Sequence, residues 1–268
     1  MKDEMRLDAW LVQQGLAGGR DKAKELLASG QVTVNGRPVY KPACRITPTD
    51  RVECTAPAER YVGRGGYKLE KLLEGQSLAG QICMDVGAST GGFTDCLLQH
   101  GAAHVYAVDV GRDQLHPALR ADPRVTVLEE TDARSETLAA AVPDGTLDGI
   151  VTDVSFVSLT RVLPPVLRYL KPEGFLICLI KPQFEAGRSD IGKRGVVRDA
   201  AVHRRVLTEL LNFFGALGLT AEQLTYSPIT GGEGNIEYLV RLRRTDGASA
   251  AAWDVSRLVA QTFVALGR

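Results

Sequence analysis

Residues 81–95 read QICMDVGASTGGFTD, and the fold assignment starts from this stretch. Residues 81–85 predict a buried β-strand, and residues 93–100 predict a helix. The turn between them is rich in glycine, so a ligand can approach the backbone closely at the helix N-terminus. Its spacing is D-x-G-x-x-x-G rather than the G-x-G-x-x-G of dinucleotide sites, and the carboxylate of Asp85 suits a cofactor that carries an ammonium and a sulfonium charge. Most glycine-rich turns bind no ligand, so this interpretation depends on the neighbouring strands.

Two further strands end near acidic residues. Residues 104–109 predict a strand that ends in Asp109, and residues 125–128 predict a strand that Asp132 follows. Asp109 lies 24 residues after Asp85, the distance at which such an acid accepts hydrogen bonds from ribose hydroxyls. Asp132 is a candidate acceptor for an adenine amino group. Each acid has an alternative role as a helix cap or a turn residue.

The rest of this half continues the alternation of strands and helices. The expected elements are strands over 147–152, 175–180, 224–226 and 236–242 and a helix over 199–218. The alternation predicts an α/β fold, a Rossmann-like, doubly wound parallel sheet. Ligands bind at the carboxyl ends of such strands, so we expect Asp153 and Lys181 to form a charge pair at the same crevice as Gly87. A plain ion pair at two strand ends is the alternative.

The first 55 residues have a different pattern, which predicts a small α+β domain. Leu7 and Leu11 begin a helix at helical spacing, and a second helix is expected over 20–29. Strand 32–34 leads into Asn35-Gly36, a strong signal for a tight type I′ hairpin. The return strand is expected to begin at Val39, and residues 51–54 predict a last strand.

Residues 6–46, RLDAWLVQQGLAGGRDKAKELLASGQVTVNGRPVYKPACRI, resemble the RNA-binding domain named after ribosomal protein S4. The motifs R-L-D-x-x-L, G-L-x-x-x-R and G-x-V-x-V-N-G carry this resemblance. Gly19 stands where family members commonly have serine, which weakens the helix cap. The resemblance implies contacts with the shape and phosphates of folded RNA. The candidate RNA-binding residues here are Arg6, Arg20, Lys22, Lys24, Asn35, Lys41 and Arg45.

Composition restricts the remaining classes of function. Lys+Arg and Asp+Glu number 32 each in 268 residues, so RNA binding must come from local patches of charge. The five cysteines form no C-x-x-C pair, which favours a reduced, cytoplasmic protein without a metal site or a disulfide framework. The N-terminus has no apolar signal segment. The longest apolar run, Phe175 to Ile180, has six residues, whereas a membrane span needs about 20.

Five motifs in order carry a second resemblance, which covers nearly the whole chain. They are RGGYKL (64–69), DVGASTGGFTD (85–95), DVSF (153–156), KPQFE (181–185) and SPITGGEGNIEYL (227–239), and together they resemble the TlyA family, historically called hemolysin A. The one departure is Gly63, where the family often has serine. Members are ribosomal RNA 2′-O-methyltransferases with a catalytic domain similar to FtsJ/RrmJ. The resemblance implies S-adenosylmethionine as cofactor, ribosomal RNA or ribosomal subunits as partner, and a cytidine ribose as methyl acceptor.

In such enzymes a Lys-Asp-Lys-Glu tetrad surrounds the target ribose. Matching by motif places the tetrad on Lys68, Asp153, Lys181 and Glu237. Lys181 is the candidate base or orienting group, and the sequence leaves both roles open. Asp153 and Glu237 would hold the two lysines in place. The candidate cofactor-binding residues are Asp85, Gly87, Ala88, Ser89, Thr90, Gly91, Gly92, Phe93, Asp109, Asp132 and Asp153.

Two basic segments are further candidates for RNA contact. Arg64 lies in the linker next to Lys68, and Lys193 and Arg194 lie in a loop after the fifth strand that could close on a phosphate. Most basic loops are only solvated, and this is the alternative. The expected domains are 6–55 for RNA binding, 56–66 as linker, 67–245 for methyl transfer and 246–268 as a helical tail.

Three other functions compete with an RNA methyltransferase. A non-catalytic ribosome-assembly factor could retain a cofactor fold, although an intact tetrad argues against it. A small-molecule methyltransferase would have no use for residues 6–54. A membrane-lytic protein, as the historical name suggests, would need a span or a strongly amphipathic aromatic helix, and neither is visible.

Overall fold

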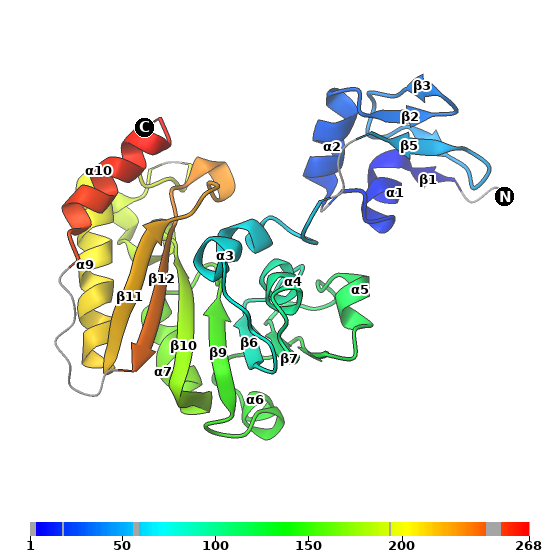
Figure 1. Ribbon diagram of the computed structural model, residues 1–268. Coiled ribbons are helices and arrows are strands. Elements are labelled where there is room, and N and C mark those ends of the chain that lie inside the picture. Colours follow the sequence, from blue (N-terminus) through cyan, green and yellow to red (C-terminus); the bar gives the residue numbers. More distant parts are fainter. Residues whose placement is uncertain (1–3, 18, 56–58, 193, 245–252, 268) are drawn as a thin grey trace. The chain divides into compact units, whose positions relative to one another are not determined.

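The computed structural model describes residues 4–17, 19–55, 59–192, 194–244 and 253–267 (Figure 1). The chain divides into two compact units, Met1–Arg64 and Gly65–Arg268. The division falls inside the expected linker over 56–66. Each unit has its own hydrophobic core, and the two are described separately.

The described part of the first unit contains short helices and short strands. They are β1 (Met5–Arg6), α1 (Leu7–Gln13), α2 (Arg20–Ala28), β2 (Val32–Val34), β3 (Arg37–Pro38), β4 (Arg45–Ile46) and β5 (Val52–Cys54). Strand β2 lies between β3 and β5, and β1 pairs with β4; all these pairs are antiparallel. Leu7, Leu11 and Leu27 are fully buried, so the apolar faces of both helices form the core of this unit.

The hairpin in the first unit has the predicted turn but a different return strand. Asn35 and Gly36 have φ of 52° and 76°, as a type I′ turn requires. The return strand is Arg37–Pro38, and the prediction that it begins at Val39 is wrong. A two-residue turn places Arg37 directly opposite Val34, so pairing starts at once.

The second unit is built on one seven-stranded sheet. Its strands are β6 (Ile82–Val86), β7 (His104–Val108), β8 (Val125–Leu128), β9 (Leu147–Thr152), β10 (Leu170–Ile180), β11 (Leu219–Tyr226) and β12 (Tyr238–Arg244). Their order across the sheet is β11-β12-β10-β9-β6-β7-β8. Strands β6 to β10 pair in parallel, and β12 is antiparallel to both of its neighbours.

The direction of β12 departs from the parallel direction expected for the sheet. Residues 227–237 connect β11 to β12 and contain only a short 3₁₀ turn at Gly232–Gly234. A parallel neighbour needs a longer crossover, usually a helix, so this short connection makes the pair antiparallel. Two strands also begin earlier than expected: β10 starts at Leu170 and β11 at Leu219.

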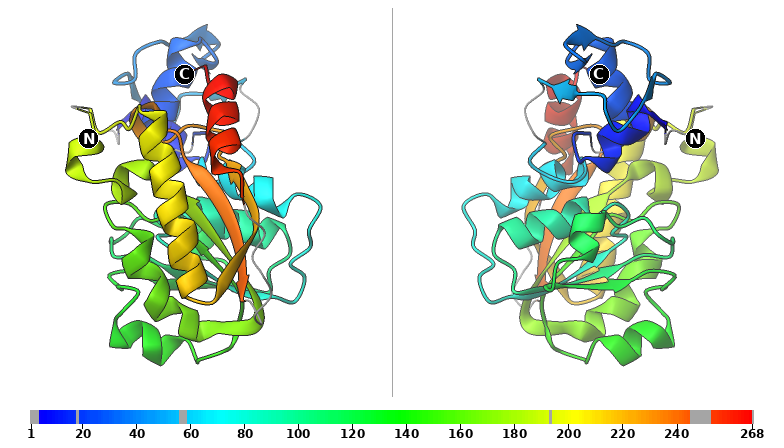
Figure 2. Two further views of the ribbon diagram at one scale, coloured as in Figure 1. Left: turned by 90° about the vertical axis from the view of Figure 1, so that its left-hand side faces the viewer. Right: turned by 90° about the vertical axis from the view of Figure 1, so that its right-hand side faces the viewer.

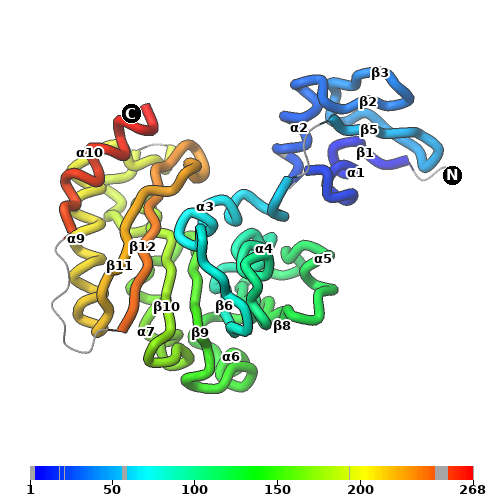
Figure 3. The backbone as a smooth tube through the Cα atoms, in the orientation of Figure 1, coloured from blue at the N-terminus to red at the C-terminus, as the bar shows by residue number. Residues whose placement is uncertain are grey.

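Helices cover both faces of the sheet (Figures 1 and 2). They are α3 (Gly65–Leu73), α4 (Gly92–Gln99), α5 (Pro117–Arg120), α6 (Glu136–Ala141), α7 (Leu159–Val166), α8 (Pro182–Glu185), α9 (Ala200–Ala216) and α10 (Val255–Ala265). Helices α6, α7, α9 and α10 share one core with the strands, whereas α3 packs against α4. The tube in Figure 3 follows this path from α3 in cyan to α10 in red. All parallel strands end at one edge, where the candidate site lies.

Candidate active site

The glycine-rich turn between β6 and α4 is pressed against the neighbouring strand ends. The N–H groups of Gly87 and Ala88 both donate to Val108 O, at 2.8 and 3.1 Å. Gly87 has a φ of 85°, and a Cβ there would lie 2.8 Å from Asp153 O. Only glycine fits this close approach, which keeps the turn against the end of β9.

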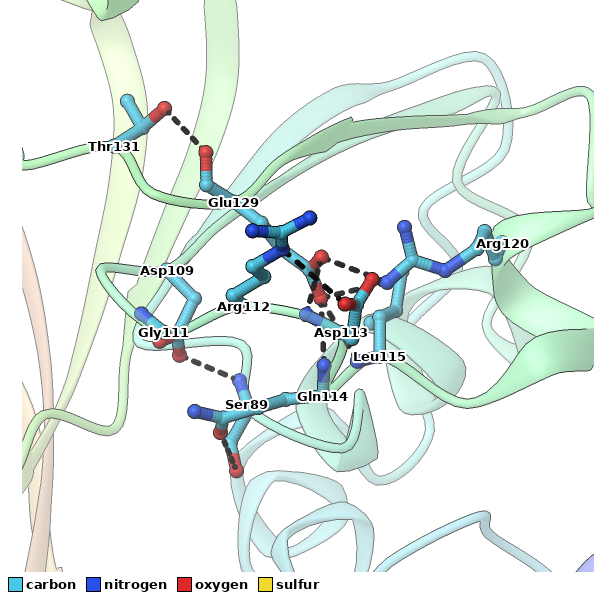
Figure 4. Close-up of polar contacts among 10 residues, drawn as sticks. All are labelled: Ser89, Asp109, Gly111, Arg112, Asp113, Gln114, Leu115, Arg120, Glu129 and Thr131. Carbon is cyan, nitrogen blue, oxygen red and sulfur yellow. Dashed lines mark hydrogen bonds and ion pairs between the residues drawn. The ribbon is translucent and has the colours of Figure 1, made fainter.

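Asp109 fixes the shape of this turn from the end of β7. Its Oδ2 accepts from Ser89 N at 2.8 Å, and its Oδ1 accepts from Gly111 N at 2.7 Å (Figure 4). Ser89 Oγ donates to Gln114 Oε1 at 3.2 Å. The Asp109 carboxylate therefore joins the loop after β6 to the loop after β7.

A cavity of about 570 Å³ opens at the carboxyl ends of the strands. Five predicted cofactor residues line it: Gly87, Ser89, Asp109, Asp132 and Asp153. The other predicted ones, Asp85, Ala88, Thr90, Gly91, Gly92 and Phe93, do not line it. Loop residues 154–157 close its other side. The volume lies in the range of small-molecule and cofactor pockets.

Asp132 lines the cavity but already has a cationic partner. Its two carboxylate oxygens accept from Arg134 Nε and Nη2, both at 2.8 Å. The hydrogen bond and charge of Arg134 lower the pKa of Asp132 to about 2. Asp132 therefore stays ionised, and its alternative role in a turn is present as well, because it accepts from Arg134 N.

Asp85 lies fully buried beneath the turn. Its Oδ2 accepts from Thr94 Oγ1 at 2.7 Å, and its Oδ1 has no hydrogen-bond partner among the described residues. Burial, reinforced by the charge of Asp153, raises the pKa of Asp85 to about 7. A buried carboxylate oxygen without a donor is costly, so a cation bound nearby would stabilise it.

The four tetrad positions form two ion pairs. Lys181 Nζ lies 2.6 Å from Asp153 Oδ1, so the expected charge pair at the strand ends is present. Lys68 Nζ lies 2.6 Å from Glu237 Oε2, and both of these side chains are buried. A Cβ on Gly231 would lie 2.0 Å from Glu237 Oε1, so the backbone at this glycine packs directly on the carboxylate.

The first turn of α3 brings the two pairs together. A Cβ on Gly65 would lie 3.6 Å from Asp153 Oδ2 and 3.2 Å from the ring of Phe93. Lys68 is three residues further along α3, which places it on the same side of the helix as Gly65. Helix α3 thus begins close to Asp153, and one turn later its Lys68 pairs with Glu237.

The loop after β9 adds two groups beside Lys181. Ser155 Oγ accepts from Lys181 Nζ at 2.9 Å. Phe156 is 89% exposed, and its ring centroid lies 4.9 Å from that of Phe184. Its φ of 65° is rare for an aromatic residue and is a form of local strain that concentrates at functional sites.

Comparison with known proteins agrees with this geometry. A family model described as FtsJ-like methyltransferase matches residues 61–244, and the S4 domain model matches residues 5–52. The chain belongs to the FtsJ-like methyltransferase family. The family description fits the strand order of the sheet and the cavity at the strand ends.

Relatives of this FtsJ-like chain are similar over nearly its whole length. It is 46% identical to Bacillus subtilis YqxC over 88% of this chain and 85% of that protein. It is 42% identical to the Mycobacterium tuberculosis protein named 16S/23S rRNA (cytidine-2′-O)-methyltransferase TlyA, over 94% of both. A solved structure of a Streptococcus thermophilus protein described as a hemolysin is 38% identical, has a TM-score of 0.76 and covers 98% of this chain and 97% of that one.

The described residues of this FtsJ-like chain lack two kinds of feature. No group of three or more His, Cys, Asp and Glu side chains is arranged to hold a metal ion there. In the same residues, no helix has the length and apolarity that crossing a membrane requires.

The predicted RNA-binding residues of the S4 domain differ in their surroundings. Arg20, Lys24, Lys41 and Arg45 are exposed, and Lys22 is exposed beside Glu25 at 3.4 Å. Arg6 is held by both carboxylate oxygens of Asp8, at 2.9 and 2.8 Å. Asn35 is exposed but has a structural role, since its Nδ2 donates to Asp50 and its Oδ1 accepts from Arg51 N. Arg64 and Arg194 are exposed, and Lys193 lies outside the described residues.

Two polar residues around the site, the half-buried Glu185 and the buried Asn235, were not predicted from the sequence. Glu185 accepts from Ser158 Oγ at 2.6 Å and from Leu159 N at 2.9 Å, which joins α8 to the loop after β9. Asn235 donates to Gly195 O and accepts from Val197 N, so it joins the basic loop to the turn before Glu237. Glu185 lies inside KPQFE and Asn235 inside SPITGGEGNIEYL, so their signal was present but carried no assigned role.

Proposed function

We propose that this protein is an S-adenosylmethionine-dependent 2′-O-methyltransferase that acts on a cytidine ribose of ribosomal RNA. The observation that carries the proposal is the pair of lysine–carboxylate contacts, Lys181–Asp153 and Lys68–Glu237, of which Asp153 lines a cavity bordered by a glycine-rich turn. The name of the M. tuberculosis relative supports the cytidine ribose as acceptor.

The residues around the cavity fit S-adenosylmethionine. Asp109 offers carboxylate oxygens for ribose hydroxyls at the end of β7, and Asp132 offers them for an adenine amino group. Asp153 lines the cavity, and the partnerless Oδ1 of Asp85 lies buried beneath the turn that borders it, so both carboxyl groups would favour an ammonium and a sulfonium bound nearby. When bound, the cofactor supplies a methyl group on a positively charged sulfur.

The Lys181–Asp153 pair would handle the acceptor hydroxyl. Lys181 Nζ contacts Asp153 and Ser155 among the described residues, which leaves one of its N–H groups to bind the 2′-oxygen. The hydroxyl proton leaves as the oxygen–carbon bond forms and the methyl–sulfur bond breaks, and with Lys181 as an ammonium the carboxylate of Asp153 would accept it. Because attack on a methyl group is in-line, holding the oxygen in position supplies most of the rate gain.

Two further features would position the nucleotide. The buried Lys68–Glu237 pair anchors α3, whose first residue, Gly65, lies close to Asp153. Phe156 presents an exposed ring on which an unstacked base could lie, as single-stranded nucleotides do on aromatic side chains. The S4 domain would bind folded RNA through Arg20, Lys41 and Arg45.

Methyl transfer from labelled S-adenosylmethionine to ribosomal subunits that lack the modification tests the proposal. The full chain is compared with Lys181→Ala and with Lys171→Ala as a matched control. Lys171 also forms a 2.6 Å ion pair on β10, with Asp148, but at the opposite end of the strand. We expect transfer by the native chain and by Lys171→Ala, and none by Lys181→Ala.

Mapping the product then identifies the modified atom. A 2′-O-methylcytidine supports the proposal as stated. Transfer to a base nitrogen or carbon, or cofactor binding without transfer to either subunit or to naked RNA, would contradict it. The second result would favour an assembly factor that retains the cofactor fold.

A further inference from the structure

Glu129, directly after β8, lies at the centre of a hydrogen-bond cluster behind the cavity. Its Oε2 accepts from Asp113 N at 2.9 Å, and its Oε1 accepts from Gln114 N at 2.9 Å and Leu115 N at 3.0 Å (Figure 4). Arg120 Nη2 lies 2.7 and 2.8 Å from the two oxygens. The Glu129 side chain is only 11% exposed. A single carboxylate thus gathers three successive backbone N–H groups and one guanidinium.

This cluster determines the shape of the loop that follows β7. Asp113 has a φ of 52°, a left-handed conformation that lets its N–H and the next two point at one carboxylate. Gln114 folds back over Gly111, where a Cβ would lie 1.8 Å from Gln114 Nε2. Gln114 then accepts from Ser89 Oγ at the rim of the cavity. Glu129 therefore acts on the cavity indirectly, by ordering the backbone that carries Gln114.

The same segment supports the glycine-rich turn from behind. A Cβ on Gly91 would lie 2.9 Å from Leu115 Cδ1 and 2.2 Å from Leu119 Cδ1. His116 N donates to Thr90 O at 3.1 Å. Leu115, whose N–H is held by Glu129, thus packs on the turn that borders the cavity. The loop and the turn keep their places together.

We propose that Glu129 is a positioning residue for the cofactor, which it serves by ordering residues 113–115 against the turn at Ser89–Gly91. It touches neither the ribose nor the reacting methyl group, because its carboxylate faces Arg120 and the backbone. The inference rests on the proposed function, since it assigns the cavity to S-adenosylmethionine. Loss of the Glu129 carboxylate should weaken cofactor affinity and leave the chemical step intact.

The charge on Glu129 is secured by its partners. The hydrogen bond from Arg120, with those from the backbone, lowers the pKa of Glu129 to about 2. Because the pKa is depressed, the stabilisation is present above the ordinary value of 4.5 and is lost only as the pH falls towards 2. The loop is therefore held at every pH at which methyl transfer would be assayed.

Steady-state kinetics with Glu129→Gln provide the test, with Glu130→Gln as the control. Glu130 is the next residue, and its side chain is exposed. The amide nitrogen of glutamine cannot accept from the backbone or from Arg120, so one side of the cluster is lost. Hydrogen bonds to a charged group contribute more free energy than those between neutral groups. We therefore expect the KM for S-adenosylmethionine to rise by about tenfold to a hundredfold. The kcat at saturating cofactor and the KM for RNA should stay within about twofold.

A second variant protects the test against a folding defect. Gln114→Ala removes the exposed end of the same chain of contacts and leaves Glu129 in place. It should raise the KM for the cofactor too, and the effects of the two substitutions should be less than additive, because they act through one loop.

The outcomes separate this inference from the proposed function. A KM for the cofactor within about twofold of the native value in both variants would overturn the inference, as would a fall in kcat with that KM unchanged. Failure of the native chain to bind S-adenosylmethionine by calorimetry would instead overturn the proposed function, and the inference with it.

Discussion

Lys68 and Glu237 hold two opposite charges in the interior of the second unit. Their side chains are only 9% and 2% exposed, and Nζ and Oε2 are 2.6 Å apart. Loss of one partner leaves the other charge buried and uncompensated, which is costly in a way that loss of an exposed pair is not. The pair is therefore one at which stability and the proposed activity would depend on the same atoms.

Glu237→Gln should lower the free energy of unfolding by about 3 kcal/mol or more, because Lys68 is left buried without an ionic partner. Urea unfolding followed by circular dichroism measures the change. Glu25→Gln, which breaks the exposed pair with Lys22, should cost about 1 kcal/mol or less. Equal losses in the two variants would show that burial of the Lys68–Glu237 pair does not matter.

Gly231→Ala offers a way to move the Glu237 carboxylate without changing its chemistry. The φ of Gly231 is −72°, so alanine fits the backbone, but its Cβ would lie 2.0 Å from Glu237 Oε1. We expect kcat to fall at least about tenfold as the carboxylate leaves Lys68. Gly232→Ala is the matched control, since nothing lies within 4 Å of a Cβ there. Similar rates in both variants would contradict the expectation.

Asp85 should make cofactor binding depend on pH. Its pKa is about 7 in the folded protein against 3.8 ordinarily, so below pH 7 the cofactor-free protein holds a proton there. A cationic ligand favours the ionised form, so binding should release that proton, and affinity should rise by up to about tenfold per pH unit as the pH approaches 7. Titration calorimetry between about pH 5.5 and 7 measures this change. The dependence should disappear in Asp85→Asn, and a flat profile in the native chain would rule it out.

Asp85 also affects stability in the same pH window. Because its folded pKa is raised, ionisation costs free energy in the folded state, and stability falls as the pH rises from about 4 to about 7. The cofactor-free Asp85→Asn variant should lack this component of the decline, which denaturant unfolding at several pH values would detect.

Among the elements, the start of α7 is joined to α8 by the serine that caps α7. Ser158 caps α7 by accepting from Thr160 N, and it also donates to Glu185 on α8. The loop that leads to Ser158 contains Asp153 and Ser155, and Lys181 directly precedes α8. The cap therefore fixes the distance between the two segments that form the Lys181–Asp153 pair.

Ser158→Ala and Ser135→Ala should separate stability from activity. Both remove a serine N-cap, of α7 and α6 respectively, and each should cost about 1 kcal/mol of stability. Only Ser158→Ala loosens the contact with Glu185, so only it should lower kcat, by about tenfold. Parallel thermal melts and rate measurements check both effects. Equal rates in the two variants would remove the role assigned to this cap.

Elements with strong local patterns were predicted from the sequence, and those fixed by distant partners were not. Strands β8 and β9 have their predicted bounds because β-branched and aliphatic residues predominate in each, VTVL and LDGIVT, and an acidic residue directly follows each. Strands β1 and β4 have two residues each, too few to show any period, and exist because they pair with each other. The direction of β12 depends on the connection from β11, which no hydrophobic pattern encodes.

For the whole molecule, exposed cations of the first unit are the groups expected to bind phosphates of the RNA. Lys41 and Arg45 lie on the described surface of the S4 domain. Removing one cation that binds a phosphate should reduce the slope of log affinity against log salt by about 1. Lys41→Ala with Arg45→Ala should thus lower the slope by about 2 and leave the KM for S-adenosylmethionine unchanged. Filter binding to ribosomal RNA at several salt concentrations measures it.

Arg51→Ala is the control for that experiment. Arg51 lies in the same unit and is 80% exposed, but it pairs with Glu53 at 2.7 Å. Its removal should change the slope less than the double substitution does. An unchanged slope in the double variant would exclude Lys41 and Arg45 from phosphate binding.

The candidate site was only partly predictable because its parts differ in how they are encoded. Asp153 and Lys181 follow adjacent strands, so the topology alone predicts their meeting. The partner of Lys68 is 169 positions away, and only the resemblance to a known family connected the two. Glu129 could not be assigned, because three of its partners are backbone N–H groups, which leave no mark in a sequence, and the fourth, Arg120, belongs to no motif.

The position of β12 in the sheet has a consequence for folding during synthesis. It lies between β10 and β11, yet it is synthesised after both, and Glu237 immediately precedes it. A growing chain makes Glu237 roughly 10 to 30 s after Lys68, at ordinary rates of translation. Until then the sheet lacks the strand between β10 and β11, and Lys68 lacks its carboxylate partner, Glu237. An enzyme proposed to modify ribosomes would therefore complete its site only after Glu237 and β12 have been synthesised, and chains that terminate before Glu237 should carry no activity.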